Sequence, residues 1–427
     1  MTACLASKSL NPSCSLFVPR FIDPNRCMAK IRHAVPCCAL EGGESLMNRQ
    51  IVKLLTICMA ATAFAAGCGN GTQPPIQCTA DRECTSSAQP VCVSGKCVEC
   101  RDATTCPTSM CRSDNTCVPA AEVVFVDNKN TACAATSQAG TIADPFCSIQ
   151  TAVEKLGGKK YIRVEPTMTP YGPIDMDGIS VTIIGKGNAF GGGAIIEGSA
   201  IAGVLCRGSS DVTIEGVEVR SSTKPGLSCT GGSARLTIRN SYIHDTKPGV
   251  EGTDCASLVV DSSSISQNIS GGISMNKTTY SITNNFIVDN FGRGVTMDDV
   301  STGVFAFNTV ARNIVNGGAA GLYCGIGDPK TIESSIFVEN VQATTMNMPI
   351  AGACTLKNVI VGMSDAMYTG AKNAAPVFKS MTDYHLPNVS ANQDCCIDKG
   401  GTGTDHDIDF EKRPTGAALD IGADEVQ

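Results

Sequence analysis

The 427-residue sequence contains no tryptophan, and aromatic residues make up only 5% of it. Charged residues are also scarce, at 17%, and the formal net charge is −7, with no cluster of basic residues. This charge balance argues against nucleic acid as a partner, because nucleic-acid binding relies on concentrated positive charge. The scarcity of aromatic side chains likewise weakens any expectation of extensive stacking on sugar rings.

The chain is instead rich in glycine, with 43 residues, and it repeats itself. A first column of apolar residues recurs every 22 to 27 positions, at Ile214, Ile238, Val260, Ile282, Phe305 and Ile332. Five residues after each member comes a second apolar residue, at Val219, Ile243, Ile265, Ile287, Val310 and Phe337. Eight residues after each member the column reads Ser222, Thr246, Asn268, Asn290, Asn313 and Asn340. A glycine followed by an apolar residue completes the unit, at Gly226, Gly249, Gly272, Gly294 and Gly321.

Three short apolar pieces per repeat are too brief for packed helices, so the period predicts a coil of three strands per turn. Successive coils would stack at the inter-strand spacing of roughly 4.8 Å and pair in parallel. The odd five-residue step predicts a corner between Ile282 and Ile287, which resets the side-chain parity so that both point inward. We expect the asparagines to form a ladder at a second corner, in left-handed backbone conformation.

The residues one position after the first column, Glu215, Arg239 and Asp261, alternate in charge and would face outward. Such cross-strand pairs contribute roughly 0.2 to 1 kcal/mol each, whereas a fully buried apolar side chain contributes roughly 1.5 to 3 kcal/mol. The inward columns therefore hold the coil together, and the outward charges mainly fix its register.

With these columns, residues 122–427 resemble the pectin-lyase-like right-handed parallel β-helix proteins. The entry segment resembles the usual opening of that family, a strand followed by a short helix that would cap the open end of the coil. Ser148 is its predicted N-cap, and the apolar stripe is Ile149, Ala152, Val153 and Leu156. Residues 396–425 are similar to the closing segment of bacterial cell-surface β-helix proteins with a predicted anchor domain, which matches Asp398, Asp405, Asp407, Arg413, Pro414, Gly416, Asp420, Gly422 and Glu425.

Residues 47–67 have the features of an export signal, with Arg49 and Lys53 ahead of an apolar run. The sequence Ala65-Ala66-Gly67-Cys68 resembles a bacterial lipobox, which implies lipid attachment at Cys68 and a membrane anchor for a soluble chain. A plain secretory signal and a membrane-spanning helix are the alternatives, although the apolar run is shorter than the roughly 20 residues that a span needs. We expect residues 1–46, upstream of this signal, not to be part of the product.

A cysteine-rich module at 78–118 follows a linker at 68–77. Its cysteines are Cys78, Cys84, Cys92, Cys97, Cys100, Cys106, Cys111 and Cys117. In an exported chain this density predicts about four disulfides of undetermined connectivity, because so few apolar residues cannot build a core. Zinc binding, suggested by Cys97-x-x-Cys100, is the alternative. Cys133 and Cys147 are expected to form a further disulfide. Cys206 and Cys229, on adjacent coils, could either bridge or simply fill an inward column.

Enzymes of the resembled fold cleave acidic polysaccharides by calcium-assisted β-elimination or by hydrolysis with paired carboxylates. Asp298 and Asp299 are the only adjacent acidic pair in the coils and are weak catalytic candidates, because the other motifs of those enzymes are missing. Asp405, Asp407 and Asp409 have the spacing of the start of a calcium loop, but Phe410 and Gly416 break its pattern. An acidic capping loop paired with Arg413 is the alternative.

The sequence thus predicts an all-β protein, a right-handed parallel β-helix preceded by a small disulfide-rich segment. We expect an exported, lipid-anchored protein of the outer membrane or cell surface, or otherwise a secreted one. We expect it to act as a rigid scaffold for adhesion or polysaccharide contact, without catalytic turnover. Its expected partners are polysaccharide or another surface protein. The competing hypothesis is an anchored polysaccharide lyase or glycoside hydrolase. No cofactor is expected, with calcium left open.

Overall fold

The computed structural model describes most of the chain after residue 77. The described residues are 78, 80–93, 96–100, 105–108, 110–112, 115–134, 138–186, 192–342, 349–362 and 368–427. The predicted export signal and the lipid-attachment residue Cys68 lie outside them.

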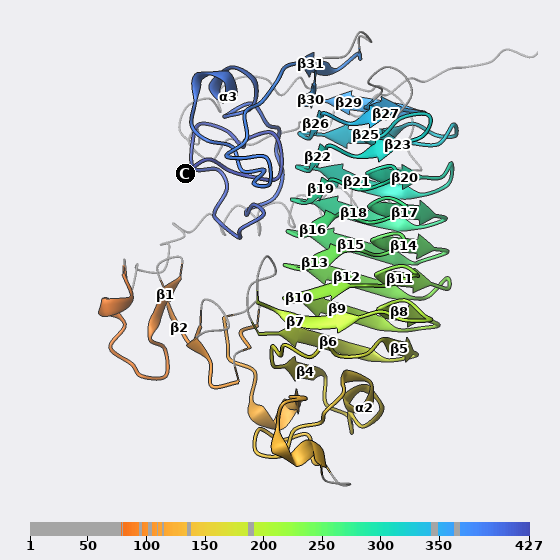
Figure 1. Cartoon of the computed structure of the whole chain (residues 1–427). Coiled ribbons are helices and arrows are strands. Elements are labelled where there is room, and N and C mark those ends of the chain that lie inside the picture. The colour runs from red at the N-terminus through yellow and green to blue at the C-terminus, as the bar shows by residue number, and fades with distance from the viewer. Residues whose placement is uncertain are drawn as a thin grey trace, which may run out of the picture. The chain divides into compact units, whose positions relative to one another are not determined.

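Three parallel sheets form the body of the described chain, and their strands stack coil upon coil (Figure 1). The first sheet contains β3 (Val123–Val126), β4 (Tyr161–Val164), β6 (Ser180–Gly185), β9 (Asp211–Glu215), β12 (Arg235–Arg239), β15 (Ser257–Asp261), β18 (Thr279–Thr283), β21 (Thr302–Ala306), β25 (Lys330–Glu333) and β29 (Cys354–Lys357). The second contains β7 (Ala194–Glu197), β10 (Val217–Arg220), β13 (Tyr242–His244), β16 (Ser264–Ser266), β19 (Phe286–Val288), β22 (Thr309–Ala311), β26 (Ile336–Val338), β30 (Val359–Val361) and β31 (Ala371–Asn373). The third contains β5 (Ile174–Asp177), β8 (Val204–Arg207), β11 (Leu227–Thr230), β14 (Val250–Thr253), β17 (Ile273–Asn276), β20 (Val295–Met297), β24 (Leu322–Tyr323) and β28 (Ile350–Ala351).

Shorter elements complete the described chain. Two small sheets are formed by β1 (Val91–Val93) with β2 (Lys96–Val98), and by β23 (Ile314–Val315) with β27 (Val341–Gln342). The helices are η1 (Asp81–Glu83), η3 (Ala120–Glu122), η4 (Thr131–Ala134), α2 (Ile149–Glu154) and α3 (Ser390–Cys395). None of the helices among these residues has the length and apolar character needed to cross a bilayer.

The predicted register of the coils is confirmed. In the first sheet Ile238 pairs with Ile214 on one side and with Val260 on the other, and the column continues to Ile282, Phe305 and Ile332. In the second sheet the column that begins five residues later pairs in the same way, from Val219 to Phe337. All of these side chains are buried in one continuous core, so the two apolar columns are its main source of stability.

The corner between the first and second sheets explains the five-residue step. Asn284 adopts a left-handed conformation with φ of 57°, which turns the chain between Ile282 and Ile287. The next residue, Asn285, is fully buried, and its side-chain amide donates to Oδ1 of Asn308 at 3.0 Å. This corner therefore carries a second ladder of polar side chains that was not predicted, formed by Ser241, Ser263, Asn285, Asn308 and Ser335.

The predicted asparagine ladder is present at the next corner, but its backbone conformation was predicted wrongly. Each amide oxygen of Asn290, Asn313 and Asn340 accepts from the asparagine of the preceding coil, at distances of 2.8 to 3.1 Å. The left-handed residue is the one before the asparagine, as at Asp289, where φ is 56°. The asparagine side chain must point inward to stack, so the sharp turn falls on its neighbour.

The glycine column follows from this ladder. A Cβ atom on Gly294 would lie 2.8 Å from the side-chain nitrogen of Asn313 and 2.8 Å from the carbonyl oxygen of Gly321. Gly272 is equally confined, because its Cβ would meet the carbonyl oxygen of Gly294 at 2.5 Å. Only glycine lets the backbone pass this close to the ladder of the next coil.

The predicted helix caps the entry end of the coil. Ser148 is its N-cap, and its side-chain oxygen accepts from the backbone N–H of Thr151 at 3.0 Å. Ile149 and Val153 on α2 are buried in the core of the first coils.

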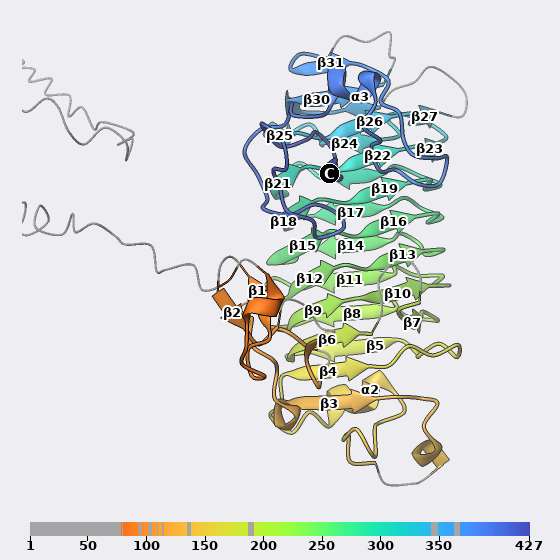
Figure 2. The same ribbon diagram turned by 90° about the vertical axis from the view of Figure 1, so that its left-hand side faces the viewer.

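The closing segment, residues 374–427, packs along the side of the later coils (Figure 2). Ser262 donates to the carbonyl oxygen of Asp407, and Tyr384 donates to Asp289 at 2.6 Å. The backbone N–H of Gly401 donates to Ser334 two coils further on. Asp261, expected to face outward from the coil, is 95% buried beneath this segment, with 5% of its surface exposed.

Candidate functional sites

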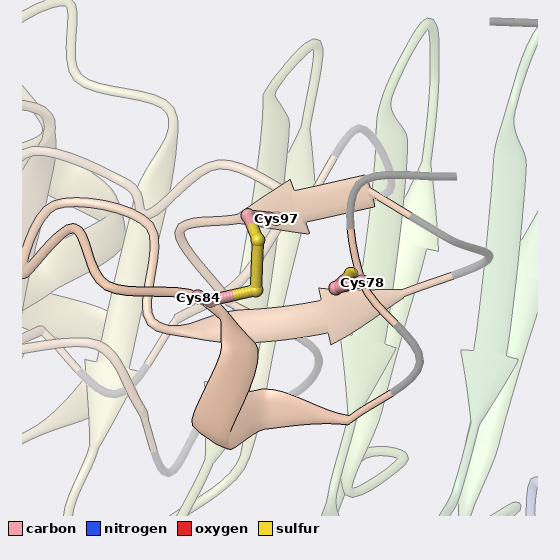
Figure 3. Close-up of side chains that lie close together, drawn as sticks. All are labelled: Cys78, Cys84 and Cys97. Carbon is pink, nitrogen blue, oxygen red and sulfur yellow. A yellow bond between two sulfur atoms is a disulfide. The ribbon is translucent and has the colours of Figure 1, made fainter. Parts of the chain in front are cut away.

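All eight cysteines of the cysteine-rich module are paired. The bonds are Cys78–Cys92, Cys84–Cys97, Cys100–Cys111 and Cys106–Cys117, so each four-cysteine half closes on itself with a first-to-third and second-to-fourth pattern. Figure 3 shows the Cys84–Cys97 bond with Cys78 beside it. These three sulfur atoms, and those of Cys100, Cys106 and Cys117, are close enough together to suggest a metal site. A disulfide leaves no thiolate to bind zinc, so the disulfide interpretation holds over the zinc alternative.

Disulfides also join parts of the β-helix. Cys133 bonds to Cys147, as expected from the sequence. Cys206 and Cys229 pair in register on adjacent strands but are not bonded to each other. Cys229 instead bonds to Cys255, and Cys206 is a buried free thiol whose pKa is raised by burial to about 12.

Two further bonds were not foreseen, Cys324–Cys354 between coils and Cys395–Cys396 between neighbouring residues. The sequence signal was weak, because Cys354 and Cys255 lie outside the repeated slot that Cys206, Cys229 and Cys324 share.

The candidate catalytic pair, Asp298 and Asp299, organises turns. Asp298 accepts from the backbone N–H groups of Ser301, at 2.8 Å, and Lys277, at 3.0 Å. Burial alone would raise the pKa of Asp298, but these hydrogen bonds lower it below its usual value. Asp299 accepts from the backbone N–H of Ile326 at 2.6 Å. An acid with a lowered pKa is a poor proton donor near neutral pH, so this arrangement does not resemble a general acid paired with a base.

The three aspartates with calcium-loop spacing each contact a different partner. Asp405 is exposed and lies against His406 at 2.8 Å. Asp407 is fully buried, and its Oδ1 accepts from the backbone N–H groups of Asp409 and Glu411. Asp409 lies 2.8 Å from Nε2 of His385. The three carboxylates therefore do not share one centre.

Other acidic positions matched by the resemblance form a buried hydrogen-bonded core of the closing segment. Glu425 accepts from the backbone N–H groups of Thr415 and Asp420, at 3.0 and 2.9 Å. Asp420 accepts from Asp398 and Val426. Burial raises the pKa of Asp420 to about 6.

Arg413 supplies the positive charge of this core. It is 97% buried, with 3% exposed, and its Nε lies 3.5 Å from Glu425. Its Nη2 donates to the carbonyl oxygen of Gly422 at 3.0 Å. Gly416 is required beside this core, because a Cβ there would lie 2.2 Å from Oδ1 of Asp398. These matched positions hold the segment's loops together, which is a structural role.

His385 lies among carboxylates at the edge of the closing segment. Its Nδ1 contacts Asp383 and its Nε2 lies 2.8 Å from Oδ2 of Asp409. The ligand atoms of His385, Asp409 and Asp424 all lie within 4.8 Å of one another. Burial opposes a charge on the ring, but Asp409 and Asp383 outweigh it and raise the pKa of His385 to about 9. Asp424 is buried, and burial raises its pKa to about 6.

A cavity of about 280 Å³ lies where the last coil meets the closing segment. The adjacent-residue disulfide forms part of its wall through Cys395, and Lys372 and Lys399 line it. The Lys372 ammonium group donates to the carbonyl oxygen of Asp394, also in the lining, so this lysine is already engaged.

One column of apolar side chains faces solvent. Each member directly follows a residue of the asparagine ladder, and the members are Ile269, Phe291, Ile314 and Val341. Phe291 is 60% exposed and Ile269 58%. Phe291 pairs with Ile314, and Ile314 with Val341, so the side chains stack on successive coils. Beside the column, the guanidinium of Arg293 lies 5.2 Å from the ring centre of Tyr323.

Comparison with known proteins finds a matching family model and a similar solved structure. Residues 180–356 match the family model described as "right handed beta helix region". No curated protein matches the chain. Among solved structures, the chain is similar to the pectate lyase Pel9A, with a TM-score of 0.42 and 12% sequence identity, over 71% of this chain and 96% of the other.

Proposed function

We propose that this chain is an exported, lipid-anchored scaffold. Its body is a right-handed parallel β-helix, the fold of the pectin-lyase-like proteins. It is held to the outer membrane or cell surface by lipid on Cys68 and makes contact with polysaccharide without turnover. The observation that carries this proposal is the set of eight disulfides in the described chain, which follows an export-type sequence. Such bonds form and persist in oxidising compartments outside the cytosol.

The disulfides also support a spacer role for the cysteine-rich module. Its apolar content is small, and the four bonds within it supply the rigidity that a core would otherwise give. A rigid module between a lipid on Cys68 and the first coil would hold the β-helix away from the membrane.

A role without turnover is supported by what the acidic candidates do. Asp298 and Asp299 are occupied by backbone N–H groups of turns. His244, next to Asp245, lies between that carboxylate and Glu218, at 2.7 and 3.2 Å. Each of these groups already has a hydrogen-bond or ion-pair partner within the protein. A substrate would have to replace that partner before the group could transfer a proton to it.

Contact with a long ligand is supported by the exposed apolar column. Four stacked apolar side chains on successive coils form a narrow strip rather than an isolated residue, and such strips mark binding surfaces. Phe291 offers an aromatic face for the apolar side of a sugar ring, and Arg293, beside it, offers a charge for an acidic group. We assign the strip to an acidic polysaccharide lying along the coils.

The anchor is tested by expressing the full chain and its Cys68→Ser variant in a bacterium fed with labelled palmitate. We expect label and membrane association for the full chain, and release of the unlabelled variant into the soluble fraction. A full chain that carries no label would refute lipid anchoring and leave a secreted protein.

The strip is tested by retention on immobilised acidic polysaccharides, with simultaneous assays for unsaturated ends and new reducing ends, with and without calcium. We expect retention without product. The variant Phe291→Ser should be retained several-fold less, whereas Met168→Ser, at a residue 92% exposed elsewhere, should match the unmodified chain. Release of either product would favour the lyase or hydrolase alternative.

A further inference from the structure

We propose that His385, Asp409 and Asp424 form a binding site for one divalent transition-metal ion of the zinc type, independently of the proposed function. The site lies wholly within the closing segment. Imidazole and carboxylate together are ligands that zinc accepts, whereas calcium prefers oxygen ligands alone.

The spacing of the three groups suits such an ion. Their ligand atoms lie within 4.8 Å of one another. Ligands at about 2.0 to 2.2 Å from a tetrahedral zinc are about 3.3 to 3.6 Å apart, so the pair His385 and Asp409, now 2.8 Å apart, would open slightly. Asp409 is exposed, which leaves room for a water molecule in the fourth position.

The surroundings already orient these ligands. The Nδ1 atom of His385 faces the Asp383 carboxylate, which directs Nε2 towards the other two groups. Metal-binding histidines typically have such a carboxylate on the second ring nitrogen. Asp424 is held by the backbone N–H of Leu386, which donates to its Oδ2 at 2.5 Å. The ring of Phe286 packs edge-on against His385, with centroids 5.1 Å apart, and limits its rotation.

Two other histidines provide an internal comparison. His244 lies between Glu218 and Asp245, and His406 lies between Asp261 and Asp405. All three histidines are thus flanked by two carboxylates. Among the described residues, only His385 has in addition a third carboxylate close enough to share one ion. The cluster at His385 therefore exceeds what a simple histidine–carboxylate pair requires.

An ion here would join three separate stretches of the closing segment. His385 follows the first of its loops, Asp409 lies in the middle, and Asp424 is near the C-terminus. The ion would also place a positive charge beside the buried carboxylate of Asp424. The segment should consequently become more resistant to unfolding when the ion is bound.

The test uses the full chain, treated with chelator and desalted, and titrated with Co²⁺ and separately with Zn²⁺ at pH 8. We expect His385→Gln and Asp409→Asn each to bind one equivalent less than the unmodified chain and to lose the absorption bands of tetrahedral Co²⁺ from this site. Cysteines outside the described residues contribute equally to metal binding in all samples. The difference in bound equivalents between the proteins therefore reports on this site. His244→Gln is the matched control and should bind as the unmodified chain does.

The melting temperature supplies a second readout. Zn²⁺ should raise it in the unmodified chain and in His244→Gln, and by clearly less in Asp409→Asn, whose exposed side chain can change without loss of folding. Equal stoichiometry in all four proteins would overturn the proposal. So would binding of Ca²⁺ but not of Co²⁺ or Zn²⁺ in the same titration.

Discussion

Asn290 and Asn313 are joined through a single oxygen atom. The backbone N–H of Asn290 donates to Oδ1 of Asn313 at 3.1 Å, and the side-chain amide of Asn290 donates to the same oxygen at 2.8 Å. Both residues are fully buried. Each coil thereby satisfies the polar groups of the one before it, which is the requirement that any buried corner must meet.

Replacement of Asn290 should therefore be costly. In Asn290→Ala two donors of Asn268 lose their acceptor, so we expect a loss of about 2 to 4 kcal/mol in the free energy of unfolding. Chemical denaturation followed by circular dichroism would measure it. Asn276→Ala, at an exposed asparagine that ends β17, should change the free energy of unfolding little. Equal denaturation midpoints for the two variants would contradict the role of the ladder.

The glycine column makes a second prediction. In Gly272→Ala the new methyl group would lie 2.5 Å from the carbonyl oxygen of Gly294 and 2.7 Å from Ile287, so we expect destabilisation by about 1 to 3 kcal/mol. Gly317→Ala is the matched control, because nothing lies within 4 Å of its Cβ position. The same denaturation experiment distinguishes them, and a stable Gly272→Ala would show that the coils can shift apart at this corner.

The contact between His406 and Asp261 should make the stability of the closing segment depend on pH. Asp261 lies 3.0 Å from the ring, Asp405 2.8 Å from it, and Arg239 lies 3.9 Å from Asp261. Hydrogen bonding to Asp261 is the main reason that the pKa of His406 is raised, although burial opposes it. The stabilisation is then fully present below about pH 6.5, the ordinary histidine value, and is lost as pH rises through the raised pKa.

The pKa of Asp261 is lowered: burial opposes ionisation, but the hydrogen bond and the charge of His406, together with hydrogen bonds from Thr283 and Asn284, outweigh it. The stabilisation that ionised Asp261 contributes is therefore present above about pH 3.8, the ordinary pKa of the group. It is lost as pH falls through the lowered pKa of Asp261. Melting temperatures between pH 5 and 9 would test the pair in the unmodified chain and in His406→Gln. The difference between the two proteins should be largest near pH 5 to 6 and shrink towards pH 9; a constant difference would exclude the ion pair.

The buried thiol of Cys206 makes a chemical prediction. Burial raises its pKa to about 12, and only the thiolate reacts with alkylating reagents. We expect iodoacetamide at pH 8 to leave the Cys206 peptide unmodified in the native protein and to modify it fully after denaturation without reductant. Mass spectrometry of the peptide would show this, and rapid native labelling would mean that the coil around Cys206 opens.

Much of the coil could be predicted because its determinants repeat. Ile238 and Ile282 are both apolar because each points into the core of its coil. The number of residues between such positions therefore gives the register of the strands directly. The left-handed residue before each ladder asparagine could not be predicted, because that position holds four different residue types, Gln267, Asp289, Arg312 and Glu339. Stacking of the coils imposes this conformation against the residues' own preferences.

The second ladder could have been found. Asn285 and Asn308 are 23 residues apart, which is the spacing of the apolar columns around them. Its signal is weaker than that of the first asparagine column, because it holds three serines and only two asparagines, whereas the first column ends in a run of four asparagines.

The sites of the closing segment could not be predicted, because they have no period and no local motif. The spacing along the chain associates Asp409 with Asp405 and Asp407, whereas its neighbours in space are His385 and Asp424. His385 and Asp424 are 39 residues apart, and only the folded segment brings them together.

The position of the closing segment has a mechanical consequence. A bare solenoid under tension can peel from its free end, one turn at a time, since each turn is held only by the next. Here the C-terminal chain is attached at Ser262, Asp289, Thr309 and Ser334, on four successive turns. A pull on the last turn is therefore shared among several turns at once, and the rod should yield in one abrupt event rather than unspool gradually.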